Sequence, residues 1–157
     1  MKVVGVTVDA GKPKRPAVRV VAAHDQVGAV TIDDLVEFSG DDVGLPAQLH
    51  YAAEALRSHL KSVSPDRVVV RRADHAPRAR QTDGTKNRLL MEGALASAAV
   101  SVVPDTRIAT GKEVGEWFGS TKQAVDDAAD AELTAEGHHG RYREATATAL
   151  AAIALGS

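Results

Sequence analysis

The stretch Val3-Val4-Gly5-Val6-Thr7-Val8-Asp9-Ala10-Gly11 decides the fold that we expect for this chain. Its apolar, valine-rich part is typical of a β-strand, and the strand ends in a carboxylate that enters a glycine turn. We interpret it as the first and central strand of a sheet. Metal-dependent phosphoryl-transfer folds place their first metal ligand at such a position, so acids from later segments would have to join Asp9.

The length and composition predict a single domain over residues 1–157, because a chain of this size can bury one core without covalent staples. Cysteine is absent, which leaves His, Asp and Glu as the candidate metal ligands. No apolar run approaches the roughly 18 residues that cross a bilayer, and the first residues lack the regions of a signal peptide. We therefore expect no membrane partner and a cytoplasmic location.

Charge and aromatic content restrict how the chain can bind nucleic acid. The formal net charge is −2, so any attraction to phosphates must come from local basic patches. Aromatic residues make up 3% of the chain, which is too few for a row of base-stacking side chains. Recognition of single strands by stacking is therefore disfavoured.

The first half of the chain predicts a three-stranded antiparallel meander followed by a helix and a buried strand. Residues 17–23 and 29–38 follow the first strand as further strands. Residues 46–62 place leucines and alanines at helical spacing. The β-branched stretch 67–71 comes directly after this helix, which indicates a strand in parallel pairing.

The second half predicts one more strand among helices. A helix over residues 86–100 leads into a short fifth strand over residues 101–104. Three further helices are expected, one that begins near Thr110, one at Ser120 or Thr121, and a last one over residues 141–155. The order is that of a meander followed by parallel strands with crossover helices.

Four short motifs in this order carry a family resemblance. They are Val6-Thr7-Val8-Asp9-Ala10-Gly11, Ser64-Pro65-Asp66-Arg67-Val68-Val69-Val70-Arg71, Gly119-Ser120-Thr121-Lys122 and Thr148-Ala149-Leu150-Ala151. Together they resemble the RuvC-type Holliday-junction resolvases of the RNase H-like superfamily. The resemblance implies an α/β fold of RNase H-like type, with a mixed five-stranded sheet flanked by helices. It also implies a homodimer through the helix over residues 86–100.

The departures from this family concern its catalytic acids. The enzymes that the chain resembles place one acid on the first strand, one at the end of the fourth and two at the start of the last helix, because two divalent ions need charge compensation. Asp9 matches the first position, but the others fall on Arg71, Ala145 and Thr148. We therefore expect no metal site and no cofactor. We also predict a salt bridge between Asp9 and Arg71 that occupies the vacated metal position.

Asp127 and Asp130 offer one route by which a catalytic site could persist. They lie about one helical turn apart on one face, which reproduces the spacing of the family's last two acids. The simpler interpretation is a solvated acidic face shared with Asp126 and Glu132.

Asp74 and Glu144 are the other candidate acids. Asp74 follows the fourth strand and needs a bulge to turn inward. Glu144 is one residue away from the expected ligand position, a rotation of roughly 100° on a helix, so we expect it to pair with Arg141 or Arg143 at the surface. If any of these acids joins Asp9, the chain is a divergent endonuclease that depends on Mg²⁺ or Mn²⁺.

Basic residues flank the expected cleft on several segments, where lysine and arginine can hold phosphate oxygens. The candidate nucleic-acid contacts are Lys12, Lys14, Arg15, Arg71, Arg72, Arg78, Arg80, Lys86, Lys112 and Lys122. We therefore predict a non-catalytic RuvC-like protein that binds structured or double-stranded DNA or RNA through a basic groove. The alternatives are the endonuclease and a protein-interaction scaffold.

Overall fold

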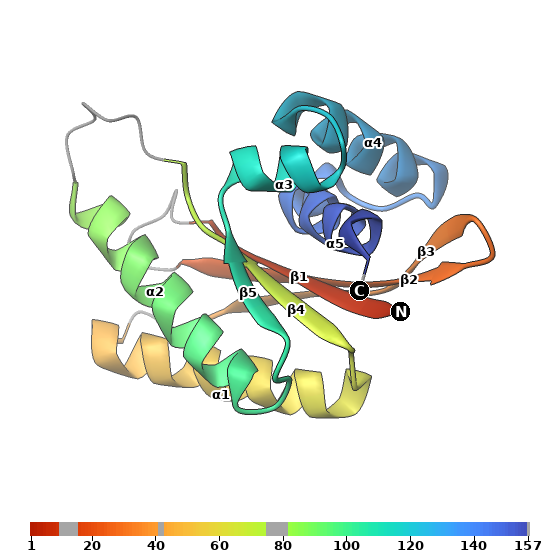
Figure 1. Cartoon of the computed structure of the whole chain (residues 1–157). Coiled ribbons are helices and arrows are strands. Elements are labelled where there is room, and N and C mark those ends of the chain that lie inside the picture. The colour runs from red at the N-terminus through yellow and green to blue at the C-terminus, as the bar shows by residue number, and fades with distance from the viewer. Residues whose placement is uncertain (10–15, 41–42, 75–81, 157) are drawn as a thin grey trace.

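The computed structural model describes residues 1–9, 16–40, 43–74 and 82–156, and its five strands form one mixed sheet in the order β3-β2-β1-β4-β5 (Figure 1). The first three strands pair antiparallel, and β4 and β5 add in parallel. The predicted meander with two parallel strands is therefore confirmed. The strands are β1 Lys2–Asp9, β2 Ala17–Gln26, β3 Ala29–Ser39, β4 Arg67–Arg71 and β5 Thr106–Ala109.

Helices cover both faces of the sheet (Figure 1). One layer consists of α1 and α2, and the other contains α3, α4 and α5. None of the helices in the described part of the chain combines the length and apolar character needed to cross a membrane. The helices are α1 Leu45–Val63, α2 Asp83–Val100, α3 Gly111–Trp117, α4 Lys122–Ala135 and α5 Arg143–Leu155, with a short 3₁₀ helix, η1, at Gly140–Tyr142.

Threonine caps fix where the later helices begin. The side chains of Thr82, Thr110 and Thr121 each accept a hydrogen bond from a backbone N–H of the first turn of α2, α3 and α4. At α3 the cap is reciprocal, because Glu113 accepts from the Thr110 backbone N–H. The hydrogen bonds from the Thr110 backbone and hydroxyl lower the pKa of Glu113.

The alternation of side chains along β1 decides which residues reach which layer. Val4, Val6 and Val8 are buried against α1 and α2. Val3 packs in the cluster formed with α3, α4 and α5. Because every second side chain of a strand points to the same face, Asp9 ends the strand on the same side as Val3. The carboxylate that the sequence singled out therefore faces the start of α5.

Gly5 allows α5 to cross β1 at close range. A Cβ atom at this position would overlap the Ala145 carbonyl oxygen and lie 3.0 Å from the Ala149 nitrogen. These are backbone atoms of α5, so they cannot swing away. The missing side chain sets the height of the α5 layer above the end of β1.

Arg67 fastens the other end of α5 to the sheet. Its buried guanidinium donates to the carbonyls of Ala152 and Gly156, at 3.1 and 2.6 Å, and its Nε donates to Asp105 at 2.8 Å. Burial acts to raise the pKa of Asp105, but the hydrogen bonds from Arg107 and Arg67 outweigh it and lower that pKa. The C-terminal carbonyls of α5 thus receive a cation.

The predicted fifth strand over residues 101–104 is wrong. The N–H groups of Val102 and Val103 donate to the Ala99 carbonyl, which makes the segment a turn that closes α2. Pro104 has no N–H to give to a ladder. Val103 is buried by packing against the core, and the strand forms after it, at β5.

Candidate functional site

A groove of about 280 Å³ opens beside Asp9, where β1 ends between the start of α5 and α2. We call it the Asp9 groove. Four arginines and two carboxylates from separate elements meet in it. It is lined by Thr7, Val8, Asp9, Arg19, Arg88, Gly140, Arg141, Arg143 and Glu144.

Within the groove Asp9 pairs with Arg19, whose Nη2 lies 3.1 Å from the Asp9 Oδ2. Arg19 stands opposite Thr7 on the neighbouring strand, so it is the diagonal neighbour of Asp9 on the same face of the sheet. Its Nε also approaches Glu37 at 3.7 Å. Asp9 remains about half exposed, with 48% of its side chain accessible.

The predicted salt bridge between Asp9 and Arg71 is wrong. The parallel register pairs Val6 with Val70, so Arg71 lies level with Thr7 and two residues short of Asp9. Its Nη1 instead lies 3.4 Å from the Asp126 Oδ1, and it also donates to the Glu144 carbonyl at 3.5 Å.

The pair of Arg71 and Asp126 is deeply buried. The two side chains are 2% and 9% exposed, so Asp126 does not belong to the solvated acidic face that we predicted. The Nη2 atom of Arg71 is buried and has no hydrogen-bond partner among the residues that the structure describes. A side chain this enclosed cannot reach a bound nucleic acid as folded, so we assign Arg71 a structural role.

The positions that correspond to the family's last two acids are also enclosed. Ala145 and Thr148 are fully buried, and the Thr148 hydroxyl donates to the Glu144 carbonyl at 2.7 Å. Over the described ranges, no group of three or more His, Cys, Asp or Glu side chains could hold a metal ion. With the Arg71 guanidinium at the fourth-strand position, these residues do not fit the two-ion centre that the resemblance implies.

Asp74 contacts the layer of α3 and α4 and does not line the Asp9 groove. One carboxylate oxygen accepts from the Gly111 N–H at 2.9 Å, and the other lies 3.3 Å from the Lys122 Nζ. Asp74 thereby connects the starts of α3 and α4. Its carboxylate therefore does not join Asp9 as a candidate metal ligand.

The acids on α4 and α5 divide between two environments. Asp127 is exposed and accepts from Gln123, whereas Asp130 pairs with Arg143 at 3.4 Å. Glu144 lines the Asp9 groove. Its predicted pairing with Arg141 or Arg143 is wrong, because these arginines contact Glu37 and Asp130 instead.

The predicted basic contacts are divided between exposed, buried and undescribed positions. Arg72, Lys86, Lys112 and Lys122 are exposed beside strand ends or helix starts. Lys12, Lys14, Arg15, Arg78 and Arg80 lie outside the described residues. Arg88, on the same basic helix start as Lys86, lines the groove together with three arginines that the basic stretches did not indicate, Arg19, Arg141 and Arg143.

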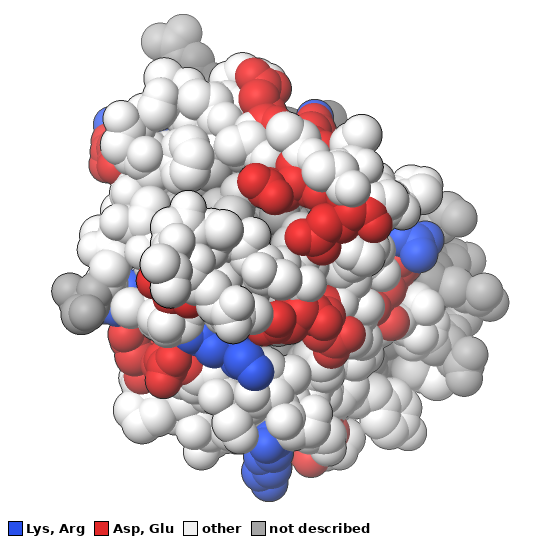
Figure 2. All heavy atoms as spheres, turned by 90° about the vertical axis from the view of Figure 1, so that its right-hand side faces the viewer, with Lys and Arg blue, Asp and Glu red and all other residues white. Residues whose placement is uncertain are grey.

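Acidic side chains dominate the opposite end of the molecule. Figure 2 shows the side that carries the β2–β3 hairpin and both termini, and on it Asp and Glu outnumber Lys and Arg. Asp25 and Asp33 belong to this hairpin, and Asp25 pairs with the N-terminal amine at 2.6 Å. That hydrogen bond raises the pKa of the amine and lowers the pKa of Asp25. A polyanion would be repelled from this end.

Comparison with known proteins identifies the fold. No protein-family model and no curated protein matches the sequence. The chain superimposes on a Thermus thermophilus RuvC structure with a TM-score of 0.72 at 15% identity, over 98% of this chain and 94% of that one. For T. thermophilus RuvC in complex with a Holliday junction substrate the values are 0.70 and 16%, with the same coverage. A yeast mitochondrial Holliday junction resolvase gives 0.59 and 12%, over 98% and 76%. The chain therefore has a RuvC-like fold of RNase H-like type.

Proposed function

We propose that this chain is a non-catalytic RuvC-like protein that binds structured or double-stranded nucleic acid, DNA in the first place, by holding backbone phosphates in the Asp9 groove. The observation that carries the proposal is the groove itself, in which four guanidinium groups gather beside Asp9, the position that the family resemblance implies for the first metal ligand. Guanidinium groups bind phosphate oxygens with two parallel hydrogen bonds. One solved structure with this fold is a RuvC complex with a Holliday junction substrate.

The charge balance of the groove predicts weak, salt-sensitive binding. Every arginine of the groove already contacts a carboxylate: Arg19 contacts Asp9, Arg88 contacts Glu92, Arg141 contacts Glu37 and Arg143 contacts Asp130. A phosphate must compete with these carboxylates for the guanidinium groups. Because binding then rests on backbone contacts, the logarithm of the binding constant should fall linearly with the logarithm of salt concentration.

Neutralising Asp9 is expected to strengthen binding. Asp9→Asn removes a negative charge from the phosphate site and releases Arg19, so we expect affinity for a labelled four-way DNA junction in EDTA to rise about fivefold. Arg143→Gln should weaken it by about five- to tenfold and make the salt dependence shallower by about one contact. Fluorescence anisotropy across a salt series measures both quantities. Arg57→Gln, on the far layer in α1, is the matched control and should leave binding unchanged.

The same Asp9 variant separates this proposal from the endonuclease. Asp9 and Glu144 share the groove, and this proximity is the observation that favours an enzyme as the second candidate. Cleavage of the junction in Mg²⁺ or Mn²⁺ that Asp9→Asn abolishes would establish the enzyme and contradict our proposal. If junction affinity does not change with salt concentration, or if the junction does not bind, the protein-interaction scaffold is favoured.

We also propose that the chain forms a homodimer through α2. The outer face of this helix exposes Leu90 and Val100, which are 52% and 51% accessible, with the small residues Gly93 and Ser97 between them. These four positions recur every three to four residues and form one stripe. Leu90→Glu should convert a dimer into a monomer in light-scattering measurements of mass. Ser62→Glu, at an exposed position of α1, is the control and should leave the mass unchanged. A parent chain that stays monomeric at every concentration contradicts this proposal.

A further inference from the structure

The strand β3 forms one margin of the sheet, beyond β2. It spans 11 residues, from Ala29 to Ser39, and pairs with β2 from end to end except at Asp33, where the register shifts between Ala22 and Ala23. The opposite edge of an outer strand presents backbone N–H and C=O groups that can pair with another extended chain. Leu35, Val36 and Phe38 are only half-buried in this strand.

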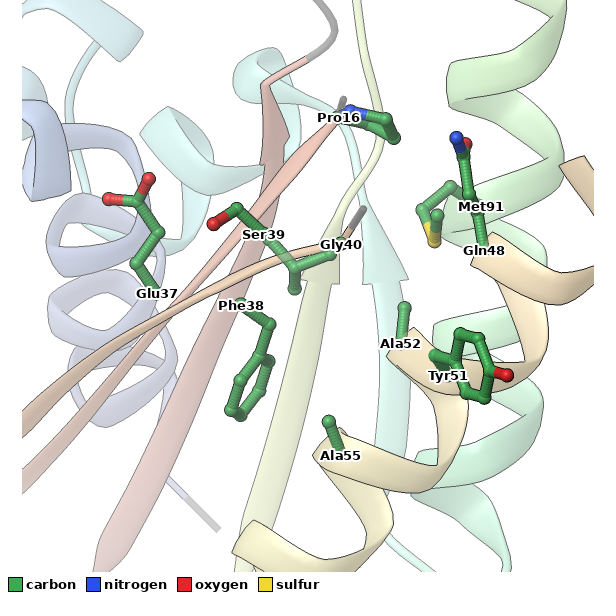
Figure 3. A pocket seen from close by; sticks show the side chains of 11 residues that line it. Pro16, Glu37, Phe38, Ser39, Gly40, Gln48, Tyr51, Ala52, Ala55 and Met91 are labelled. Atoms are coloured by element: carbon green, nitrogen blue, oxygen red, sulfur yellow. The ribbon is translucent and has the colours of Figure 1, made fainter. Parts of the chain in front are cut away.

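An apolar pocket opens beside the end of this strand. Its volume is about 340 Å³, which is at the small end of the range for ligand pockets of about 300–1,000 Å³. Figure 3 shows Phe38 pointing from β3 toward α1, with Tyr51 and Ala55 on α1 and Met91 on α2 around the same space. Tyr51 is 60% exposed, so the pocket is open to solvent.

The pocket lies on the α1 and α2 face of the sheet, whereas the Asp9 groove lies at the end of β1, where Asp9 and Arg19 point toward α5. Val18 and Phe38 line the pocket and pack with the α1 and α2 core, whereas Arg19 and Asp9 face α5. A strand that pairs with β3 would point every second side chain toward the pocket face and the others toward the Glu37 face, where Figure 3 shows the Glu37 side chain pointing away from α1. One extended segment could thus engage both faces of the edge.

The charge of β3 identifies the kind of segment that fits. The strand carries Asp33, Asp34 and Glu37 and contains no Lys or Arg. Glu37 contacts Arg19 and Arg141 from neighbouring elements, whereas Asp33 and Asp34 contact the histidines His24 and His59. A second copy of β3 would bring the same carboxylates together, and like charges across a strand pair are destabilising. Nucleic acid would meet the same repulsion. A basic peptide segment has the complementary charge.

We propose that the outer edge of β3 and its adjacent pocket bind an extended basic segment of a partner protein by strand addition. Apolar side chains of the segment enter the pocket beside Phe38, and its lysines or arginines face the carboxylates of β3, where they compete with Arg19 and Arg141 for Glu37. Backbone pairing supplies affinity and the pocket supplies selectivity, as in other modes of strand addition. This interaction is separate from the proposed nucleic-acid binding and does not depend on it.

The test uses a blocked heptapeptide that alternates lysine with valine, leucine and valine, added to the full-length ¹⁵N-labelled chain. We expect amide shifts to concentrate on residues 36–39 and on the pocket residues of α1 and α2. Ala55→Phe, which fills the pocket mouth, should weaken binding about tenfold, and Glu37→Gln by about threefold. The same peptide with glutamate in place of lysine is the matched control and should not bind.

Three results would overturn the proposal. These are the absence of any shift with the lysine peptide, equal binding of the glutamate peptide, and shifts that Ala55→Phe leaves unchanged. A concentration-dependent doubling of mass that Ala55→Phe abolishes would show that the edge pairs with a second copy instead. Junction binding by Ala55→Phe should equal that of the parent, so failure of this proposal is distinguishable from failure of the proposed function.

Discussion

Asp126→Ala is expected to lower the free energy of unfolding by about 3–5 kcal/mol, because it leaves the Arg71 guanidinium buried without a counter-charge. Both members of the pair are at least nine-tenths enclosed, so water cannot replace the lost carboxylate. Arg71 also donates to the Glu144 carbonyl at 3.5 Å, but this oxygen carries no net charge and cannot replace the carboxylate. Urea unfolding followed by circular dichroism measures the loss.

Two further variants show whether the loss comes from the pair itself. Asp127→Ala changes the exposed neighbour on the same helix and should stay within about 0.5 kcal/mol of the parent. Arg71→Met combined with Asp126→Leu removes both charges and should recover most of the stability, since apolar replacements of buried ion pairs are often neutral. If Asp126→Ala is as stable as the parent, Arg71 has another partner in solution and the assignment of this pair is wrong.

The sequence predicts on which face of the sheet Asp9 and Arg71 lie, but it does not predict whether they form a salt bridge. Alternation along two neighbouring strands correctly brings Asp9 and Arg71 to the same face, near the ends of β1 and β4. Their salt bridge also requires the lateral register, and a shift of two residues, about 6.6 Å along a strand, separates them. No local pattern in either strand fixes that register, because the buried positions of both are mostly valine and fit equally well after a shift of two residues.

Asp126 could not be predicted as the partner for a related reason. It lies 55 positions away from Arg71 in an alanine-rich helix where neighbouring acids are exposed. One residue of difference on a helix turns a side chain by about 100°, and only the packing of α4 decides which acid points inward. Val125, Ala129 and Leu133 mark the buried face, and Asp126 adjoins it.

Arg19, Arg141 and Arg143 lie outside the basic stretches from which phosphate contacts were predicted. Arg19 stands in the middle of an apolar strand, and Arg141 and Arg143 come from a remote segment near the start of α5. A usable signal did exist. In the antiparallel register Arg19 faces Thr7, so its parity places it on the same side as Asp9. Order and type of the elements, in contrast, followed from local patterns and were predicted well, apart from the fifth strand.

Gly5→Ala is expected to cost about 3 kcal/mol or more, because its new methyl group would overlap the Ala145 carbonyl oxygen and force α5 away from β1. The cost is larger than for ordinary overpacking, since neither the strand nor the helix backbone can rotate out of the way. The start of α5 supplies Arg143 and Glu144 to the Asp9 groove, so junction binding should weaken together with stability.

Gly93→Ala is the matched control for this variant. Gly93 is an exposed residue in the middle of α2, and a Cβ atom there meets no other atom within 4 Å. Alanine should therefore stabilise the helix by about 0.5–1 kcal/mol, measured at a concentration where the chain is monomeric, because Gly93 also belongs to the stripe proposed for dimer contact. Chemical unfolding of the two variants side by side compares a glycine required by close packing with one that is not. If Gly5→Ala unfolds at the same urea concentration as the parent, α5 does not lie against β1, and the groove that we assign to phosphate binding is not formed as described.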